Sequence, residues 1–419
     1  MKNSGVEWIG EIPDDWEVKP LKALFTFGKG LPITKENLKE SGIPVISYGQ
    51  IHSKTNTGTT IHNNLLRYVD ESYLISNPQS LVQQGDFIFA DTSEDLAGCG
   101  NCAYVDSYLK LFAGYHTVIL QSKDKSENRY LAYLFKIDEW RKQIRENLVE
   151  VKVYSVSRKI LRKSTVILPP KGTQKKIASY LDSKCSKIEE TIQNQQQVIE
   201  KLKAYKQSLI TEAVTGKIKI QNGKACGKYE EYKDSGVEWI GEIPSGWEPI
   251  KAKYFIKISN GSDPKTSEGN TPVYGSGAES FKTCVEYKEG PTVLIGRKGA
   301  TLHIPHYIEG NYWNVDTAFD VKTYSEEKFL LRFYYYCATA FDYKFYLTST
   351  TLPSMTQTNY GNMYLPVPNI QTQKEVVEFL DKQCKNIDTA IEQKEKLIEK
   401  LTEYKKSLIY ECVTGKKEV

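Results

Sequence analysis

The sequence has no uninterrupted run of about 18 apolar residues, so it predicts no membrane-spanning helix. Its first seven residues, Met1 to Glu7, lack the apolar run of a signal peptide. It also lacks a strong charge of either sign: a formal net charge of +4 over 419 residues does not by itself indicate nucleic-acid binding. The eight cysteines are too dispersed to indicate a disulfide scaffold, so a reducing, cytoplasmic compartment is expected.

Motifs for catalysis are also missing. There is no P-loop, no His-Glu-x-x-His and no Asn-Pro-Pro-aromatic tetrad of the kind that amino-methyltransferases carry. Acidic-x-Lys triplets such as Asp182-Ser183-Lys184 recur by chance in a charged chain and give little support to a nuclease. The lone Cys99-x-x-Cys102 supplies only two ligands, which favours two ordinary thiols over a metal or redox centre. The sequence therefore predicts no catalytic residue, metal or cofactor in this chain.

What the sequence does contain is a duplication. The segment Ser-Gly-Val-Glu-Trp-Ile-Gly-Glu-Ile-Pro at residues 4–13, here called the opening motif, returns unchanged at 235–244. A second segment, residues 173–217, returns in diverged form at 372–416. The offsets are 231 and 199 residues, so the first half is 32 residues longer between the two repeats. Each half therefore has a different domain between the same two repeated segments. This arrangement suggests a protein that contacts two different targets at a fixed separation.

The second repeat predicts a long helix in each half. Its apolar and small residues alternate in steps of four and three over more than four heptads, which is typical of a coiled coil. A Thr-Gly pair stops each helix, and prolines precede each start. We expect the two helices to pair antiparallel within the chain rather than with other proteins. The predicted seam consists of Leu181, Ile188, Ile192, Ile199, Leu202, Leu209, Leu380, Ile387, Ile391, Ile398, Leu401 and Leu408.

The antiparallel arrangement gives a specific register hypothesis. It places Ile192 near Leu408, Ile199 near Leu401, and Leu209 near Ile391, with Gln195 opposite Lys405. Trp8 and Trp16, together with their repeats Trp239 and Trp247, are expected to pack on the helix of the opposite half.

The segments between the repeats mix short β-type apolar runs with one helical stretch each, near 128–147 and 325–346. The fold class is therefore α+β: two pseudo-repeated globular domains joined by a pair of long antiparallel coiled-coil helices, with approximate twofold internal symmetry. The expected boundaries are 1–167 for the first opening motif and domain, 168–216 for the first helix, 217–234 for a linker, 235–366 for the second opening motif and domain, and 367–419 for the second helix.

Three polar stretches are candidates for contact with nucleic acid. One is a basic run, another is rich in hydroxyls and amides, and the third is a basic turn between two glycines. Solvated surface loops are the plainer alternative for each. The candidate residues are Lys152, Tyr154, Ser155, Ser157, Arg158, Lys159, Arg162, Lys163, Arg297, Lys298, Thr350, Thr351, Ser354, Thr356, Gln357 and Asn359.

The doubled opening motif, with Trp16 and Trp247 three residues after its proline, resembles the start of each half of specificity (S) subunits of type I restriction–modification systems. So does the Thr-Gln-Lys segment leading into a long helix that ends in Val-Thr-Gly-Lys. The family usually has Glu-Gln where this chain has Thr-Gln at 173–174 and 372–373. The resemblance covers the architecture of the whole chain, and its specific part is the connectors.

The resemblance implies that each domain is a target recognition domain for one half of a split, asymmetric sequence of double-stranded DNA. It implies that the paired helices set the gap between the halves and dock two methylation (M) subunits, which carry S-adenosylmethionine. Restriction (R) subunits, with ATP and Mg, would join that core. The alternatives are an adaptor that pairs two ligand-binding domains without DNA, and a nuclease or methylase with a hidden site.

Overall fold

The structure is a computed structural model that describes residues 1–107, 110–124, 128–148, 153–277, 279–299, 301–343, 346 and 353–419. The chain divides into two compact units. The first consists of Met1–Gln193 and Leu397–Val419, and the second of Asn194–Lys396. Helices α7 (Lys171–Val214) and α10 (Ile370–Val413) both pass from one unit into the other. Each unit therefore combines one α+β domain with a part of each long helix.

The domain of the first unit has its strands in two four-stranded sheets, ordered β10-β8-β12-β4 and β6-β5-β11-β7, and in several short pairs. Its strands are β1 (Lys2–Asn3), β2 (Glu11–Ile12), β3 (Glu17–Pro20), β4 (Phe25–Lys29), β5 (Ile43–Ile46), β6 (Arg67–Val69), β7 (Leu81–Val82), β8 (Phe87–Ala90), β9 (Thr92–Ser93), β10 (Cys102–Tyr104), β11 (Leu111–Ala113), β12 (Thr117–Ser122), β13 (Tyr154–Ser155) and β14 (Thr165–Leu168). Its helices are α1 (Leu21–Leu24), α2 (Tyr48–Ile51), α3 (Tyr73–Ser76), α4 (Arg129–Leu134), α5 (Asp138–Arg145) and α6 (Arg158–Lys163), with 3-10 turns η1 (Lys35–Asn37), η2 (Asn63–Leu65) and η3 (Pro78–Ser80).

The second unit has a four-stranded sheet, β20-β26-β23-β24, and a three-stranded sheet, β22-β21-β25. Its strands are β15 (Ile220–Gln221), β16 (Lys224–Ala225), β17 (Tyr232–Asp234), β18 (Glu242–Pro244), β19 (Glu248–Lys251), β20 (Ile256–Asn260), β21 (Thr271–Tyr274), β22 (Ser280–Cys284), β23 (Thr292–Gly296), β24 (His306–Ile308), β25 (Trp313–Asn314), β26 (Ala318–Thr323) and β27 (Tyr364–Val367). Its helices are α8 (Leu331–Ala340) and α9 (Gln357–Asn362), with the 3-10 turn η4 (Ala252–Tyr254).

The two domains repeat one topology. The order β4-β12-β8-β10 in the first matches β20-β26-β23-β24 in the second, and all these pairings are antiparallel. Each domain adds a parallel pair, β5 with β11 and β21 with β25. In each, the strand after the opening motif pairs with the strand that leads into a long helix, as β3–β14 and β19–β27. The expected α+β class and internal symmetry are confirmed.

Aromatic packing forms the core of the first domain. The strand β8 is buried along its whole length, and its rings meet those of the helical segment 129–145. The ring centroid of Phe135 lies 4.8 Å from that of Phe87 and 4.3 Å from that of Trp140. Aromatic pairs at these distances stabilise the core beyond the effect of the area that they bury.

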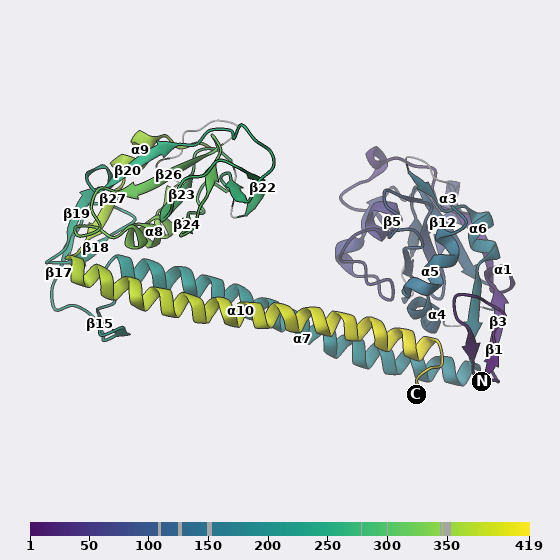
Figure 1. The fold of residues 1–419 in the computed structure, drawn as a ribbon. Helices are drawn as coiled ribbons and strands as arrows, with labels where there is room; N and C mark the ends of the chain where they lie inside the picture. The colour runs from purple at the N-terminus through teal and green to yellow at the C-terminus, as the bar shows by residue number, and fades with distance from the viewer. Residues whose placement is uncertain are drawn as a thin grey trace. The chain divides into compact units, whose positions relative to one another are not determined.

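The long helices bury the predicted seam. All twelve seam residues are buried or half-buried, and α10 runs beside α7 (Figure 1). In the first unit Cys185 and Ile188 share a cluster with Leu408 and Ile409. In the second unit Leu209 shares one with Leu380 and Ile387. The heptad pattern therefore predicted the paired face correctly.

The predicted register is wrong. Lys405 forms an ion pair with Glu189 rather than facing Gln195, whose side chain instead accepts a hydrogen bond from Lys394 at 3.1 Å. Lys206 forms an ion pair with Asp388 at 2.7 Å. The expected register would have placed Lys206 opposite Lys394, which brings like charges together. A slip of about two helical turns removes that repulsion and forms two opposite-charge pairs, while the apolar period stays in phase.

The helix ends close on the opening motifs. Gly415, with φ of 72°, ends α10 in a Schellman turn in which the Lys416 N–H donates to the Glu411 carbonyl at 2.9 Å. A Cβ on Gly415 would lie 2.6 Å from Cδ of Pro13 and 3.2 Å from the ring of Trp16. In the second unit the end of α7 repeats this geometry: Gly216 faces Pro244 and Trp247. The expectation that Trp16 and Trp247 pack on the helix of the opposite half is confirmed.

Candidate DNA-binding interface

The basic run of the first domain folds into β13 and the short helix α6. The hydroxyl of Ser157 caps α6 by accepting from the Ile160 N–H at 3.3 Å, and Tyr154 and Ser155 pair with Ser93 and Thr92 of β9. The four predicted cations of α6 are all exposed, and within the described part of the chain none forms an ion pair with a carboxylate. They are Arg158, Lys159, Arg162 and Lys163. Exposed cations that have no carboxylate partner are suited to phosphate groups.

The second domain brings two of the predicted stretches together. Lys298 forms a β-bridge with Ser354, and the Met355 N–H donates to the Arg297 carbonyl at 2.9 Å. Nη1 of Arg297 donates to the Asp316 carbonyl at 3.3 Å, and Nζ of Lys298 lies 3.6 Å from the Asp316 carboxylate. The basic turn and the polar loop therefore form one surface.

The polar residues that follow serve the local structure. Thr356 caps α9 by accepting from the Asn359 N–H at 3.0 Å, just as Ser157 caps α6. The Asn359 amide donates to the Tyr346 carbonyl at 2.9 Å, and Gln357 donates to the Asn260 side chain at 3.1 Å. These residues hold the loop that carries Ser354. Lys152, Thr350 and Thr351 lie outside the described residues.

One group at the corresponding place in the first domain escaped the sequence analysis. The residues equivalent to Arg297–Lys298 are Asp91–Thr92, and His116 lies beside them, with Nδ1 3.3 Å from Oδ1 of Asp91. Rings of Tyr48 and Tyr115 surround His116. No local motif marks these residues, because the fold gathers them from three separate segments.

The acidic-x-Lys triplet at Asp182 is structural. Oδ2 of Asp182 accepts from Nε of Arg129 at 2.6 Å, and Oδ1 accepts from the Tyr133 hydroxyl at 2.6 Å. Burial first, and then this hydrogen bond, raises the pKa of Tyr133, so the hydroxyl stays protonated and donates. Asp381 repeats the arrangement in the second unit, with Arg332 and Tyr336. These carboxylates join each domain to a long helix.

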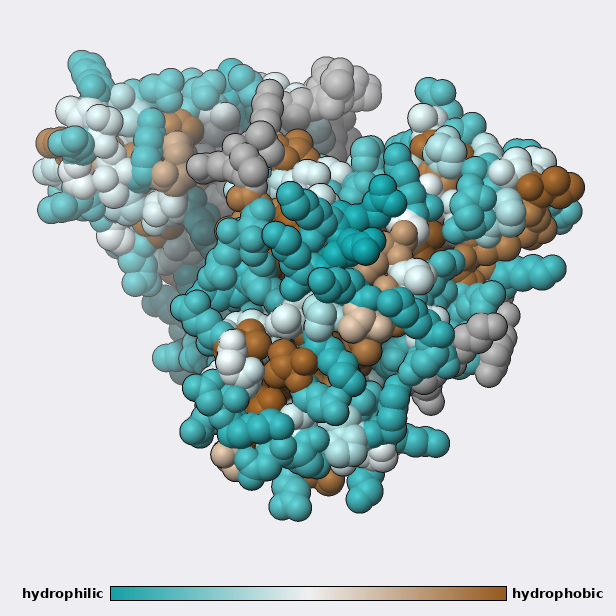
Figure 2. All heavy atoms as spheres, turned by 90° about the vertical axis from the view of Figure 1, so that its right-hand side faces the viewer, coloured by the Kyte–Doolittle hydropathy of each residue, from teal (hydrophilic) through white to brown (hydrophobic). Residues whose placement is uncertain are grey.

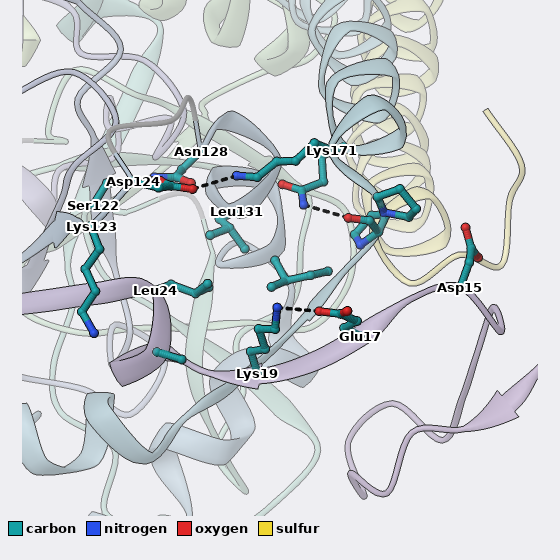
Figure 3. A pocket seen from close by; sticks show the side chains of 15 residues that line it. Asp15, Glu17, Lys19, Leu24, Ser122, Lys123, Asp124, Asn128, Leu131 and Lys171 are labelled. Carbon is teal, nitrogen blue, oxygen red and sulfur yellow. Dashed lines mark hydrogen bonds and ion pairs between the residues drawn. The ribbon is translucent and has the colours of Figure 1, made fainter.

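A cavity of about 450 Å³ lies in the first unit where β3, α4 and the start of α7 meet (Figure 3). Four of its charged groups form two ion pairs: Lys19 lies 2.5 Å from Glu17, and Lys171 lies 3.2 Å from Asp124. The buried amide of Gln174 donates to the Pro169 carbonyl at 2.8 Å. The polar part of the described lining therefore connects neighbouring elements to one another.

The two thiols of the Cys-x-x-Cys segment are buried and free. Burial raises the pKa of Cys99, and it raises that of Cys102 to about 12. Such thiols stay protonated and unreactive at neutral pH. Among the described residues, no group of three or more His, Cys, Asp or Glu side chains is placed to hold a metal ion. Nor does any described helix have the length and apolarity needed to cross a membrane.

The face drawn in Figure 2 is covered mostly by hydrophilic side chains, with hydrophobic ones in smaller patches. The two domains have one topology, and each carries an exposed polar site at the same place on its sheet. Each domain is also joined to the same pair of helices. These features define a protein with two equivalent recognition modules.

Comparison with known proteins identifies this architecture. The family model of the type I restriction modification DNA specificity domain matches residues 13–204 and 244–402, so the chain belongs to this family. A protein named as the MjaX specificity subunit of a type I restriction enzyme, from Methanocaldococcus jannaschii, is 25% identical over 97% of this chain and 95% of its own. The EcoKI specificity subunit of Escherichia coli is 21% identical over 50% of this chain and 44% of its own.

Two solved structures share the fold. A chain from a study of complex assembly and conformational transition of the type I R-M system has a TM-score of 0.70 at 14% identity, over 97% of this chain and 99% of that one. The HsdS subunit of Thermoanaerobacter tengcongensis has a TM-score of 0.51 at 14% identity, over 97% and 98%.

Proposed function

We propose that this chain is the subunit that gives a type I restriction–modification complex its DNA sequence specificity, with each domain recognising one half of a split, asymmetric target. One observation carries the proposal: the two domains repeat the same strand order but differ in chemistry at the equivalent surface. The first presents the cationic helix α6, and the second presents the neutral α9 beside Arg297 and Lys298. One scaffold with two different surfaces suits two different half-sites.

In this proposal the chain itself carries no catalytic group or cofactor and acts in the cytoplasm, where the DNA is. Two methylation subunits, with S-adenosylmethionine, dock on it, and restriction subunits with ATP and Mg join through them. The support for this is the family membership together with the structural roles of Asp182 and Cys99–Cys102 described above. The long helices α7 and α10 would set the unread gap.

The test is sequencing of adenine methylation in a host that expresses this chain with its neighbouring methylase, compared with a host that expresses the methylase alone. A split motif that appears only when this chain is present is the expected result. An adaptor without DNA function would give identical methylation in both hosts, and its purified complex would show no salt-dependent affinity for DNA.

The basic helix gives a prediction about affinity. Replacing Arg158 and Lys159 by glutamine should weaken DNA binding of the complex about tenfold. It should also reduce the magnitude of the slope of log K against log salt concentration by about two. The methylated sequence should stay the same, because phosphate contacts carry no sequence information. Filter binding over a salt series measures both quantities.

The charge-matched control is the pair Lys35→Gln and Lys142→Gln, which removes two exposed lysines of the same domain outside α6. An equal loss of affinity and slope in both variants would show that only net charge matters, against a phosphate contact at α6.

A further inference from the structure

We propose that His116 and the residues around it form the base-contacting surface of the first domain, and that His116 recognises an exocyclic amino group in the major groove. The surface, here called the His116 cluster, rests on the proposed function, which it makes more specific. Its members are Tyr48, His52, Asp91, Thr92, Tyr115 and His116.

Three rings make the cluster compact. The ring of Tyr48 lies 5.4 Å from that of His116 and 5.6 Å from that of Tyr115, and Tyr115 lies 6.0 Å from His116, all edge to face. Tyr48 and Tyr115 are half-buried, while 58% of the His116 side chain is exposed. The tyrosines thus support a histidine that faces solvent.

Hydrogen bonds of His52 hold the backbone of the cluster in place. Nε2 of His52 lies 2.8 Å from the Thr92 carbonyl, which can only accept, so that nitrogen carries the hydrogen. Nδ1 of His52 then accepts from the amide of Asn101 at 3.1 Å. Because both nitrogens of His52 are engaged, its role is to position the Thr92 backbone.

The same reasoning sets the chemistry of His116. Nδ1 lies 3.3 Å from Oδ1 of Asp91, which also accepts from the Thr92 hydroxyl at 2.7 Å. An ionised carboxylate only accepts, so Nδ1 of His116 carries its hydrogen toward Asp91, and when the ring is neutral Nε2 is left as an acceptor. In the major groove an acceptor matches the amino group of adenine N6 or cytosine N4.

The backbone of His116 is unusual. Its φ of 54° lies in the left-handed region, which residues other than glycine adopt uncommonly, although histidine is found there more often than most, as asparagine and aspartate are. Glycine would avoid this cost, so the histidine side chain is there at the expense of local stability. Strained residues of this kind occur preferentially at functional sites.

The cluster adjoins the basic helix. β9, which contains Thr92, pairs with β13, and the Val156 N–H donates to the Asp91 carbonyl at 2.8 Å, two residues before α6 begins. One surface therefore offers exposed cations for phosphates beside a fixed acceptor and aromatic rings for a base edge.

The second domain has the same backbone pattern with different side chains. The Arg297 N–H donates to the Thr317 carbonyl at 2.8 Å, as the Asp91 N–H does to that of His116 at 3.1 Å. An arginine stands where the first domain has the aspartate that orients His116. The two surfaces thus differ in chemistry at equivalent positions of the repeated fold, where one domain has Asp91 and the other has Arg297.

The experiment uses the full chain in complex with its methylation subunits and the target found by methylation sequencing. His116→Gly removes the ring and suits the observed φ, so it should fold at least as well as the original chain. Competition binding with each base pair of the target replaced in turn should show about tenfold loss of preference at one pair in one half-site, with the other half unaffected.

A base analogue tests the predicted contact directly. Replacing the recognised adenine by purine, or cytosine by 2-pyrimidinone, removes the amino group. This should weaken binding of the unaltered complex about tenfold and should not weaken binding of the His116→Gly complex further. His116→Asn, which tolerates the same φ, is a second variant, and His62→Asn is the control for an exposed histidine outside the cluster.

The outcomes separate the two claims. If the unaltered complex prefers no sequence, the proposed function fails. If the unaltered complex is specific while His116→Gly and His116→Asn both keep the same preference at every base pair, the assignment of His116 is overturned and the proposed function stands.

Discussion

Replacing Gly415 by alanine should lower the free energy of unfolding by about 3 kcal/mol, whereas the same change at Gly5 should cost about 1 kcal/mol. Both glycines lie in the first unit and have nearly the same backbone angle, with φ of 72° and 70°. Each alanine therefore meets a similar left-handed strain, and the space around the added Cβ differs strongly.

The surroundings explain the predicted difference. A Cβ on Gly5 meets nothing within 4 Å, but a Cβ on Gly415 would lie 2.6 Å from Cδ of Pro13 and 3.2 Å from the ring of Trp16. Pro13 is rigid and Trp16 is only 4% exposed, with its ring edge-on to the buried ring of Tyr130. Neither side chain can move aside without disturbing the core.

Urea unfolding followed by tryptophan fluorescence measures both variants. Equal losses at Gly415 and Gly5 would mean that the end of α10 does not pack closely on the opening motif. The corresponding pair in the second unit, Gly216→Ala against Gly236→Ala, repeats the comparison, because Gly216 faces Pro244 at 2.5 Å and Gly236 faces open space.

The duplicated connectors were predictable because they repeat. A heptad pattern and a Thr-Gly stop depend on neighbours along the helix, so they predicted the seam and the ends of both helices. The register did not follow, since apolar residues spaced by heptads pack equally well after a slip of seven. Charge pairs across the helices, Lys206 with Asp388 and Lys405 with Glu189, distinguish the registers.

The candidate interface also has one part that the sequence predicted and one part that it did not. The cations of α6 are consecutive in sequence, so a basic run was enough to find them. The His116 cluster joins residues from three segments around positions 48, 91 and 116, which only the pairing of strands brings together. Ser157 and Thr356 were found as polar loop residues, but their hydroxyls cap helices.

The proposed role of the long helices predicts that changing their length changes the target. Inserting one heptad into α7 alone, after Gln193, should abolish specific DNA binding, with a loss of about 1000-fold or more toward the non-specific level. Gln193 and Lys396 are the points where α7 and α10 pass between units. Lengthening one helix and not the other forces the seam out of register in one unit.

A matched variant carries one heptad in both helices, copied from residues 187–193 after Gln193 and from residues 390–396 after Lys396. Its seam stays in register, so its thermal stability should match that of the original chain. Each helix becomes about 10 Å longer, which corresponds to about three base pairs of DNA. We expect methylation of the original target to be lost, and any new split motif to have a longer gap.

Methylation sequencing of hosts that express each variant with the methylase distinguishes a spacer from a passive support. If the variant with both insertions still methylates the original sequence with its original gap, the helices do not set the spacing. If only the one-helix variant loses activity, the effect belongs to seam packing, because the two variants differ in whether Lys206–Asp388 and Lys405–Glu189 can still pair. Loss of the original target in a two-helix variant that folds stably and still binds the methylation subunits comes from the changed length.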